Sequence, residues 1–108
     1  MAVHKELGHG FLEIVYKDAI ELELKAKAIP YSREQAFIIN YKGTVLPHRY
    51  FADFVVGDQI ILEVKAQEGG LSYQQVPQLI NYLRASGHKV GLLVNFGRTK
   101  LDFKRLVF

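Results

Sequence analysis

The sequence predicts an α+β fold, an α/β sandwich in which helices flank a sheet, and three observations support this. At 108 residues the chain can form one hydrophobic core but not two, so we expect residues 1–108 to be a single domain. Hydrophobic residues make up 49% and charged residues 23%, the balance of an ordinary folded protein. Apolar residues follow a helical period in two segments and strand-like patterns between and after them.

Residues 11–27 predict the first helix. A Gly-His-Gly break precedes it, and Pro30 ends it because proline disfavours continuation. Apolar residues recur at alternating intervals of three and four along it: Leu12, Val15, Ala19, Leu22 and Ala26. We expect this stripe to face the sheet.

Residues 36–56 predict two strands with a turn at Lys42-Gly43. Pro47 indicates an edge or a bulge near the start of the second strand. Gly57-Asp58 predicts the next turn, and residues 59–66 predict a third strand. Its nearly continuous apolar character is typical of a central strand that is covered on both faces.

The second helix follows a glycine-rich loop. Ser72, with Gln75 three residues later, resembles a capping box, and Gly87 is a good C-terminal stop. Pro77 indicates that the helix starts later than this cap or bends. Its apolar face is formed by Val76, Leu79, Ile80 and Leu83.

Two strands complete the chain. Residues 89–96 predict a buried strand, and residues 101–108 predict an amphipathic one with Leu101, Phe103 and Arg105 on one face. The first three strands can form an antiparallel meander. The crossover helix would then return the fourth strand parallel to the third.

Three charged residues interrupt the apolar strands: Asp53, Glu63 and Lys65. Glu63 and Lys65 share a face, because residues two apart in a strand point the same way. Asp53 joins that face only if the turn between the strands has three or five residues, or if a bulge intervenes. Two carboxylates on one face repel each other unless a cation neutralises them, and Mg²⁺ or Mn²⁺ prefers such oxygen ligands.

This set of residues predicts metal-assisted phosphodiester hydrolysis. Asp53 and Glu63 would hold the metal, and Lys65 would orient a water, assist its deprotonation or stabilise negative charge in the transition state. The alternative is structural: Glu63 and Lys65 protrude from a sheet edge, and Asp53 pairs with Arg49 or Lys65. The short motif alone does not decide between the two.

Composition limits the partners of such a site. The chain has no cysteine, so metal ligands must be carboxylates, carbonyls or histidines, and the four histidines show no metal-ligand spacing. The net charge of +3 is compatible with a polyanionic partner. Apolar stretches are strand-sized and the first residues lack a signal-peptide pattern, so we expect a cytoplasmic protein without membrane spans.

Further motifs resemble those of a known family. Gly10, Glu13 and Tyr16 form a G-x-x-E-x-x-Y signature. The similarity continues in order through Glu23-Leu24, Gln35, "ADFVV", "ILEVKA", "QLINYL" and "GLLVNFG". In these features the chain resembles the GxxExxY family, a branch of the PD-(D/E)xK nuclease superfamily.

The resemblance implies a restriction-endonuclease-like core of a helix, three antiparallel strands, a helix and a strand, followed here by a C-terminal strand. It also implies a Mg²⁺ or Mn²⁺ site formed by Asp53, Glu63, the main-chain carbonyl of Val64 and Glu13. Lys65 would complete the catalytic set with Glu13, Asp53 and Glu63. From the residues alone, Glu13 could equally be a surface glutamate favoured in a first helical turn.

A pair on the second helix is also implied to take part. Gln78 and Tyr82 match a Q-x-x-x-Y spacing and lie one helical turn apart on the same face. They would support the site or contact a phosphate. The alternative is an ordinary polar helix face.

The expected function is that of a hydrolase, a metal-dependent nuclease that cleaves nucleic acid, DNA more than RNA. The alternative is a catalytically inactive nucleic-acid-binding or assembly domain that keeps the nuclease fold. Three features depart from the family: a short segment before the glycines, His9 where proline is common, and Pro77 before Gln78. The short segment and the apolar C-terminal strand suggest a homodimer, because an exposed edge can pair with another copy.

Overall fold

The computed structural model describes residues 2–71 and 75–107 and has the predicted α+β architecture. Within these residues there are three helices, α1 (Ala2–Leu7), α2 (Glu13–Ala26) and α3 (Gln75–Ser86). The main sheet contains β1 (Tyr31–Phe37), β4 (Tyr50–Val56), β5 (Ile60–Lys65), β6 (Val90–Asn95) and β7 (Asp102–Val107). Two short strands, β2 (Asn40–Tyr41) and β3 (Thr44–Val45), form a separate hairpin.

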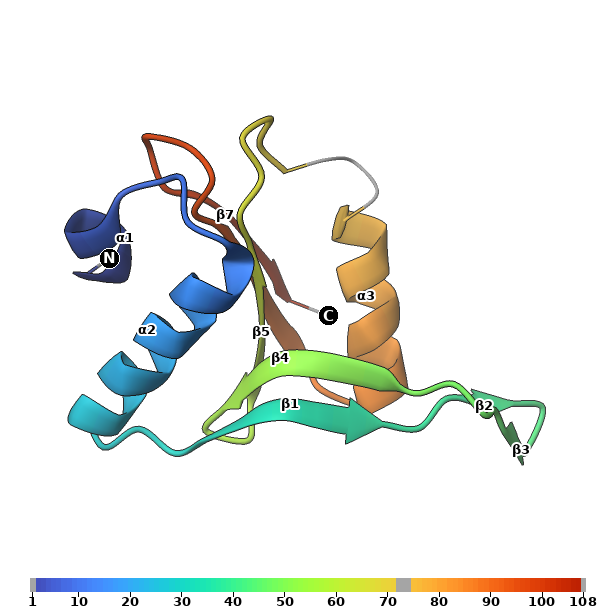
Figure 1. The fold of residues 1–108 in the computed structure, drawn as a ribbon. Helices are drawn as coiled ribbons and strands as arrows, with labels where there is room; N and C mark the ends of the chain where they lie inside the picture. Colours follow the sequence, from blue (N-terminus) through green and yellow to red (C-terminus); the bar gives the residue numbers. More distant parts are fainter. Residues whose placement is uncertain (1, 72–74, 108) are drawn as a thin grey trace.

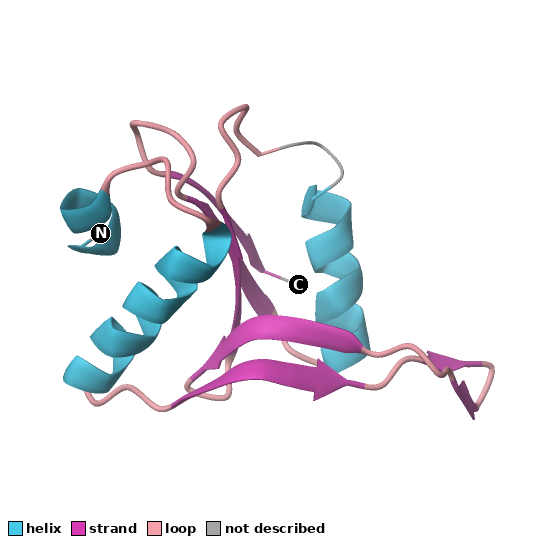
Figure 2. Ribbon diagram, in the orientation of Figure 1, coloured by secondary structure: helices cyan, strands magenta, loops and turns pink. Residues whose placement is uncertain are grey.

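The sheet has the order β1-β4-β5-β6-β7, with α2 and α3 on opposite sides (Figure 1, Figure 2). β1, β4 and β5 form an antiparallel meander, β6 returns parallel to β5, and β7 is antiparallel to β6. The predicted meander, crossover and central third strand are therefore confirmed. None of the described helices combines the length and apolar composition needed to cross a membrane.

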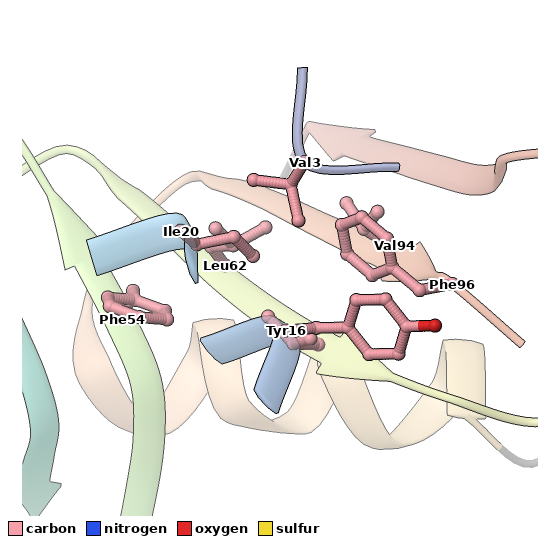
Figure 3. Close-up of a cluster of buried hydrophobic side chains, with 8 residues drawn as sticks. Val3, Tyr16, Ile20, Phe54, Leu62, Val94 and Phe96 are labelled. Carbon is pink, nitrogen blue, oxygen red and sulfur yellow. The ribbon is translucent and has the colours of Figure 1, made fainter. Parts of the chain in front are cut away.

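Two hydrophobic clusters hold the helices to the sheet. The α2-side cluster includes the stacked rings of Tyr16 and Phe96, whose centroids are 4.7 Å apart (Figure 3). Its buried members are Val3, Tyr16, Ile20, Phe54, Leu62, Val64, Val94 and Phe96. Those of the α3-side cluster are Tyr50, Ala52, Val55, Ile61, Leu79, Leu83 and Leu93.

The predicted buried stripe of the first helix is confirmed only in part: Ala19 packs against the α2-side cluster, but the two leucines of the stripe do not. Leu22 is 68% exposed and Leu12 is also exposed, whereas Tyr16, Lys17 and Ile20 face inward. The inward face is therefore rotated relative to the prediction and includes a lysine. A buried lysine is costly unless it is paired, which is why a pattern based on apolar residues misses this face.

Residues 36–56 differ from their prediction as well. The first strand starts earlier, at Tyr31, and the Lys42-Gly43 turn belongs to the β2–β3 hairpin, which projects from the body of the fold (Figure 1). Both turn residues have positive φ, 49° and 83°, as a tight hairpin turn requires. The hairpin residues are exposed, so no buried face fixes their pairing within the main sheet.

The remaining elements follow the prediction with small changes. Within the described residues α3 begins at Gln75, so Pro77 lies in its first turn, and Gly87 with φ 77° ends it; Ser72 lies outside the described residues. β7 is a sheet edge. On its predicted face Leu101 packs against the α2-side cluster, but Phe103 and Arg105 are exposed. Pairing of this edge with a second copy stays a prediction.

Candidate functional site

The turn between β4 and β5 satisfies the condition set by the sequence. Val56 pairs with Ile60, which leaves a three-residue turn, and the pairing continues to Phe54 and Leu62. In this register Asp53 and Glu63 occupy the same position on neighbouring strands. Both are buried, with 7% and 6% of their surfaces exposed.

Asp53 lies where β4 and β5 stop pairing through their main chains. Phe54 and Leu62 are the last paired residues, and beyond them the N–H of Val64 donates to Asp53 Oδ2 at 2.8 Å. A carboxylate that accepts such a bond is held in one orientation. The side chain thus anchors itself to β5 and directs its second oxygen, Oδ1, toward α2.

The position opposite Asp53 on β1 is distorted. Glu34 has a φ of 55°, a left-handed conformation that costs a residue with a side chain about 1–3 kcal/mol. The alternation of side chains along β4 is interrupted here, a change called the face exchange below. Ala52 packs in the α3-side cluster and Phe54 in the α2-side cluster, although residues two apart in a regular strand share a face. Asp53 therefore stands between the two faces.

Lys17 of α2 brings three carboxylates together. Its Nζ lies 2.7 Å from Asp53 Oδ1, 3.3 Å from Glu34 Oε1 and 3.6 Å from Glu13 Oε2. Burial lowers the pKa of Lys17, but the hydrogen bonds and charges of Asp53 and Glu34 more than offset this, so its pKa is raised. Lys17 is therefore a fixed positive charge beside Asp53.

Glu63 has a different environment. It points to the α3 side, where it accepts a hydrogen bond from the hydroxyl of Tyr50. Burial first, and then the charge of Asp53, raises its pKa to about 8. Tyr50 in turn stacks on Tyr82 of α3, with centroids 3.6 Å apart and planes at 12°. Burial and the charges of Glu63 and Asp53 also raise the pKa of Tyr82, which places its hydroxyl within electrostatic reach of the site.

Lys65 is half-buried near the end of β5, on the same face as Glu63 by strand alternation. Its charge lowers the pKa of Glu63, though less than burial and Asp53 raise it. The chain after Lys65 is held by Asn95, which accepts from the N–H of Gln67 at 2.8 Å and donates to its carbonyl at 2.9 Å. Gly97 permits this approach, because a Cβ at that position would overlap the main chain of Gln67.

Most of the predicted residues converge. Asp53 and Lys65 both lie near Glu63, and Glu13 contacts Lys17, which in turn contacts Asp53. Tyr82 stacks on Tyr50, whose hydroxyl donates to Glu63. Gln78, by contrast, is exposed on α3.

The structural alternative placed the charges at a sheet edge with Arg49 or Lys65 paired to Asp53. Instead, β5 is central, Glu63 is buried and the ion-pair partner of Asp53 is Lys17.

Three residues of the site were not predicted: Lys17, Glu34 and Tyr50. Lys17 had a visible signal, because Glu13 and Lys17 are four apart and so share a helix face. Glu34 had none, since no turn residue indicates a left-handed conformation there. Tyr50 would face away from Asp53 in a regular strand, and only the exchange of faces brings its hydroxyl to Glu63.

The donor set fits a hard divalent cation. Across residues 2–71 and 75–107, no three Asp, Glu, His or Cys side chains gather closely enough to hold a metal by themselves. Mg²⁺ needs fewer, because it commonly uses one or two carboxylates and keeps several waters. Asp53 and Glu63 meet that requirement, and a cation between them would offset the repulsion that arises when both are charged.

Comparison with known proteins agrees with this arrangement. A sequence profile described as the PD-(D/E)XK nuclease superfamily matches residues 1–106. The chain belongs to this superfamily. A solved structure titled "Crystal structure of SSO0001" is similar, with a TM-score of 0.66 and 22% identity over 88% of this chain and 50% of that one. The chain thus spans about half of that protein, and the likeness shows a common fold. A search of curated proteins found no match.

The residue pattern that names the PD-(D/E)XK superfamily can be located on two strands of this fold. Asp53 on β4, with Glu63 and Lys65 on β5, has the order and spacing of the D…(D/E)xK pattern after which the superfamily is named. The expected restriction-endonuclease-like core is confirmed. PD-(D/E)XK nucleases generally use divalent metals and act on nucleic acid.

Proposed function

We propose that residues 1–108 form a Mg²⁺- or Mn²⁺-dependent nuclease domain of the GxxExxY branch, which hydrolyses phosphodiester bonds in DNA in preference to RNA. One observation carries the proposal: two buried carboxylates, Asp53 and Glu63, occupy one register position where β4 and β5 separate, with Lys65 on the same face. Such a pair is costly to bury without a cation, which a purely structural role does not explain.

Asp53, Glu63 and the main-chain carbonyl of Val64 would hold the metal, and Glu13 would bind it or position a water. A metal bound there would neutralise charge on the scissile phosphate and lower the pKa of an attacking water. The protein's own contribution is to fix the donors in advance. Asp53 is held by the Val64 N–H, and Glu63 by the Tyr50 hydroxyl.

Lys65 would orient the attacking water and stabilise negative charge that develops on the phosphate. The hydrogen bonds between Asn95 and Gln67 hold the chain just after β5, so the main chain that carries Lys65 is fixed in position. Tyr82 would support Tyr50 by stacking, and Gln78, exposed one turn earlier, would contact a phosphate of the substrate.

Cleavage of labelled single-stranded, double-stranded and branched DNA and RNA, with Mg²⁺, Mn²⁺ or EDTA, tests the proposal. We expect metal-dependent products, DNA cut faster than RNA, and a loss on the order of 100-fold or more in Lys65→Ala and Glu63→Ala. Lys104→Ala, an exposed lysine on β7, is the matched control and should cleave like the parent. Equal cleavage by Lys65→Ala and the parent would contradict the assignment.

The second candidate is a catalytically inactive nucleic-acid-binding or assembly domain. The ion pair between Lys17 and Asp53 favours it, because an ammonium already satisfies the carboxylate that would bind the metal. Tight, metal-independent binding of nucleic acid without cleavage of any substrate would support this candidate over the nuclease.

A further inference from the structure

Both oxygens of Asp53 are engaged. Oδ2 accepts from the N–H of Val64 at 2.8 Å, and Oδ1 is paired with Lys17 Nζ at 2.7 Å. The first bond ties the side chain to the central strand. A cation that binds Asp53 from the α2 side therefore meets Oδ1, the oxygen that Lys17 occupies.

Two cations would repel each other at this oxygen, so Mg²⁺ and the Lys17 ammonium compete for it. Mg²⁺ binds carboxylate oxygen at about 2.0–2.1 Å and carries its own waters, so it needs the volume filled by the ammonium group. We propose that Lys17 is a resident counter-ion of the site and that a divalent cation binds Asp53 by displacing it. This inference rests on the proposed function, because it concerns the same metal position.

The surroundings of Lys17 provide a destination for the displaced group. Glu34 and Glu13 already contact Nζ, and their side chains are 50% and 42% exposed, whereas that of Asp53 is 11% exposed. Lys17 can leave Asp53 and stay paired with Glu34, which lies nearer to solvent and is not one of the proposed metal ligands. Movement by a few ångströms thus exchanges one cation for another at Asp53 without leaving a buried charge unpaired.

The strain at Glu34 supports this role. Its left-handed backbone directs a carboxylate at Lys17 from a strand that would otherwise be regular. Strained residues persist where the surrounding structure holds them, and they concentrate at functional sites. Glu34 is therefore suited to receive Lys17, rather than to bind the metal itself.

The first test follows Lys17 in the parent protein by amine acetylation and mass spectrometry. In EDTA, the buried and paired Lys17 should react slowly. With saturating Mg²⁺ or Ca²⁺ we expect its labelling to rise several-fold, whereas labelling of exposed Lys25 on the same helix should not change. A metal that binds while Lys17 stays protected overturns the proposal.

The second test removes the lysine. Lys17→Met should bind Mn²⁺ at least about ten-fold more tightly than the parent, as measured by paramagnetic resonance of free Mn²⁺. Lys25→Met, which changes the net charge equally, is the matched control and should match the parent. Lys17→Met should also be destabilised in EDTA and stabilised by Mn²⁺ more than the parent is, since Asp53 then lacks a counter-ion.

If Lys17→Met fails to fold in EDTA, recovery of the folded protein on adding Mn²⁺ supports the proposal, and the labelling test on the parent remains decisive. Binding by Lys17→Met but not by the parent also supports it, while the nuclease proposal fails for the parent. Unchanged or weaker binding by Lys17→Met overturns the inference alone, because cleavage by the parent is judged separately. Absence of binding in both proteins overturns the metal site and the inference together.

Discussion

Two clusters of charge join α2 to β1, each built around one cation, and they differ in what surrounds it. In the fastener cluster, Arg33 of β1 contacts Asp18 Oδ1 at 2.8 Å and Glu21 Oε1 at 3.1 Å. The hydroxyl of Tyr31 donates to the other oxygen of Glu21 at 2.8 Å. In the site cluster, Lys17 faces Asp53, Glu34 and Glu13.

The difference is in burial and charge balance. Asp18 is 65% exposed, so water can replace Arg33 there, and no carboxylate of the fastener cluster is buried. The site cluster contains buried Asp53 and borders Glu63, whose charge no cation balances fully. The first cluster is satisfied as it stands and holds two elements together. The second has one cation for three carboxylates and borders a buried fourth, Glu63, which gains its charge more readily when a cation is nearby.

The largest expected effect comes from the same substitution made in both clusters. Asp53→Asn should reduce metal-dependent cleavage on the order of 100-fold or more, because the amide cannot supply the charge that holds the cation. Asp18→Asn removes a carboxylate of the same type from the fastener cluster and should cleave like the parent. Rates are measured on the best substrate of the cleavage panel, with folding checked by circular dichroism. Equal losses in the two variants would mean that the clusters do not differ in function.

The next effect is on the pH dependence of stability. In the native protein Glu63 keeps its proton up to about pH 8, whereas in the unfolded chain it releases it near pH 4.5. The native state therefore binds more protons in this interval, and the contribution of Glu63 to the free energy of unfolding falls as pH rises from about 4.5 to 8. Glu63→Gln removes this decline and should be more stable than the parent at pH 9, by on the order of a few kcal/mol.

Urea denaturation in EDTA at several pH values measures that difference. Glu68→Gln, at an exposed glutamate, controls for the change in net charge. A difference between Glu63→Gln and the parent that stays constant from pH 5 to 9 would show that Glu63 is charged throughout.

The fold was largely predictable from local pattern. Apolar runs, the Gly57-Asp58 turn and Gly87 marked the strands and the end of α3, and a crossover helix left few topologies. The inward face of α2 was not predictable, because it includes Lys17, whose burial depends on partners from β1 and β4. The sequence assigned the β2–β3 hairpin to the main strands, because a turn signal does not indicate which sheet the strands beside it join.

The site was predictable in its acidic pair but not in its charge balance. The sequence placed Asp53 and Glu63 together on the condition of an odd turn or a bulge, and the three-residue turn of the structure meets that condition. The spacing of Glu13 and Lys17 was visible, but the approach of Lys17 to Asp53 was not predictable, because it depends on the face exchange at Asp53 and the left-handed Glu34. Neither the face exchange nor the left-handed Glu34 is marked by a turn residue or an apolar pattern in the sequence.

The smallest expected effect comes from breaking the fastener cluster. Arg33→Met keeps the apolar stem but loses the ion pairs and the position of the guanidinium 5.7 Å from the centre of the Phe54 ring. We expect the free energy of unfolding to fall by about 1–2 kcal/mol, because partly exposed pairs contribute little and water solvates the released carboxylates. Urea denaturation measures the loss, and 1 M NaCl should shrink it since salt screens these charges.

The same variant should bind Mn²⁺ with the affinity of the parent, because Asp53 and Lys17 are untouched. Weaker Mn²⁺ binding by Arg33→Met would mean that the two clusters act as one network across β1, and that Arg33 helps to set the position of Glu34. Unchanged Mn²⁺ binding with reduced stability would show that the two clusters have separate roles. Arg33 then holds α2 to β1, and Lys17 occupies the position that a metal can take.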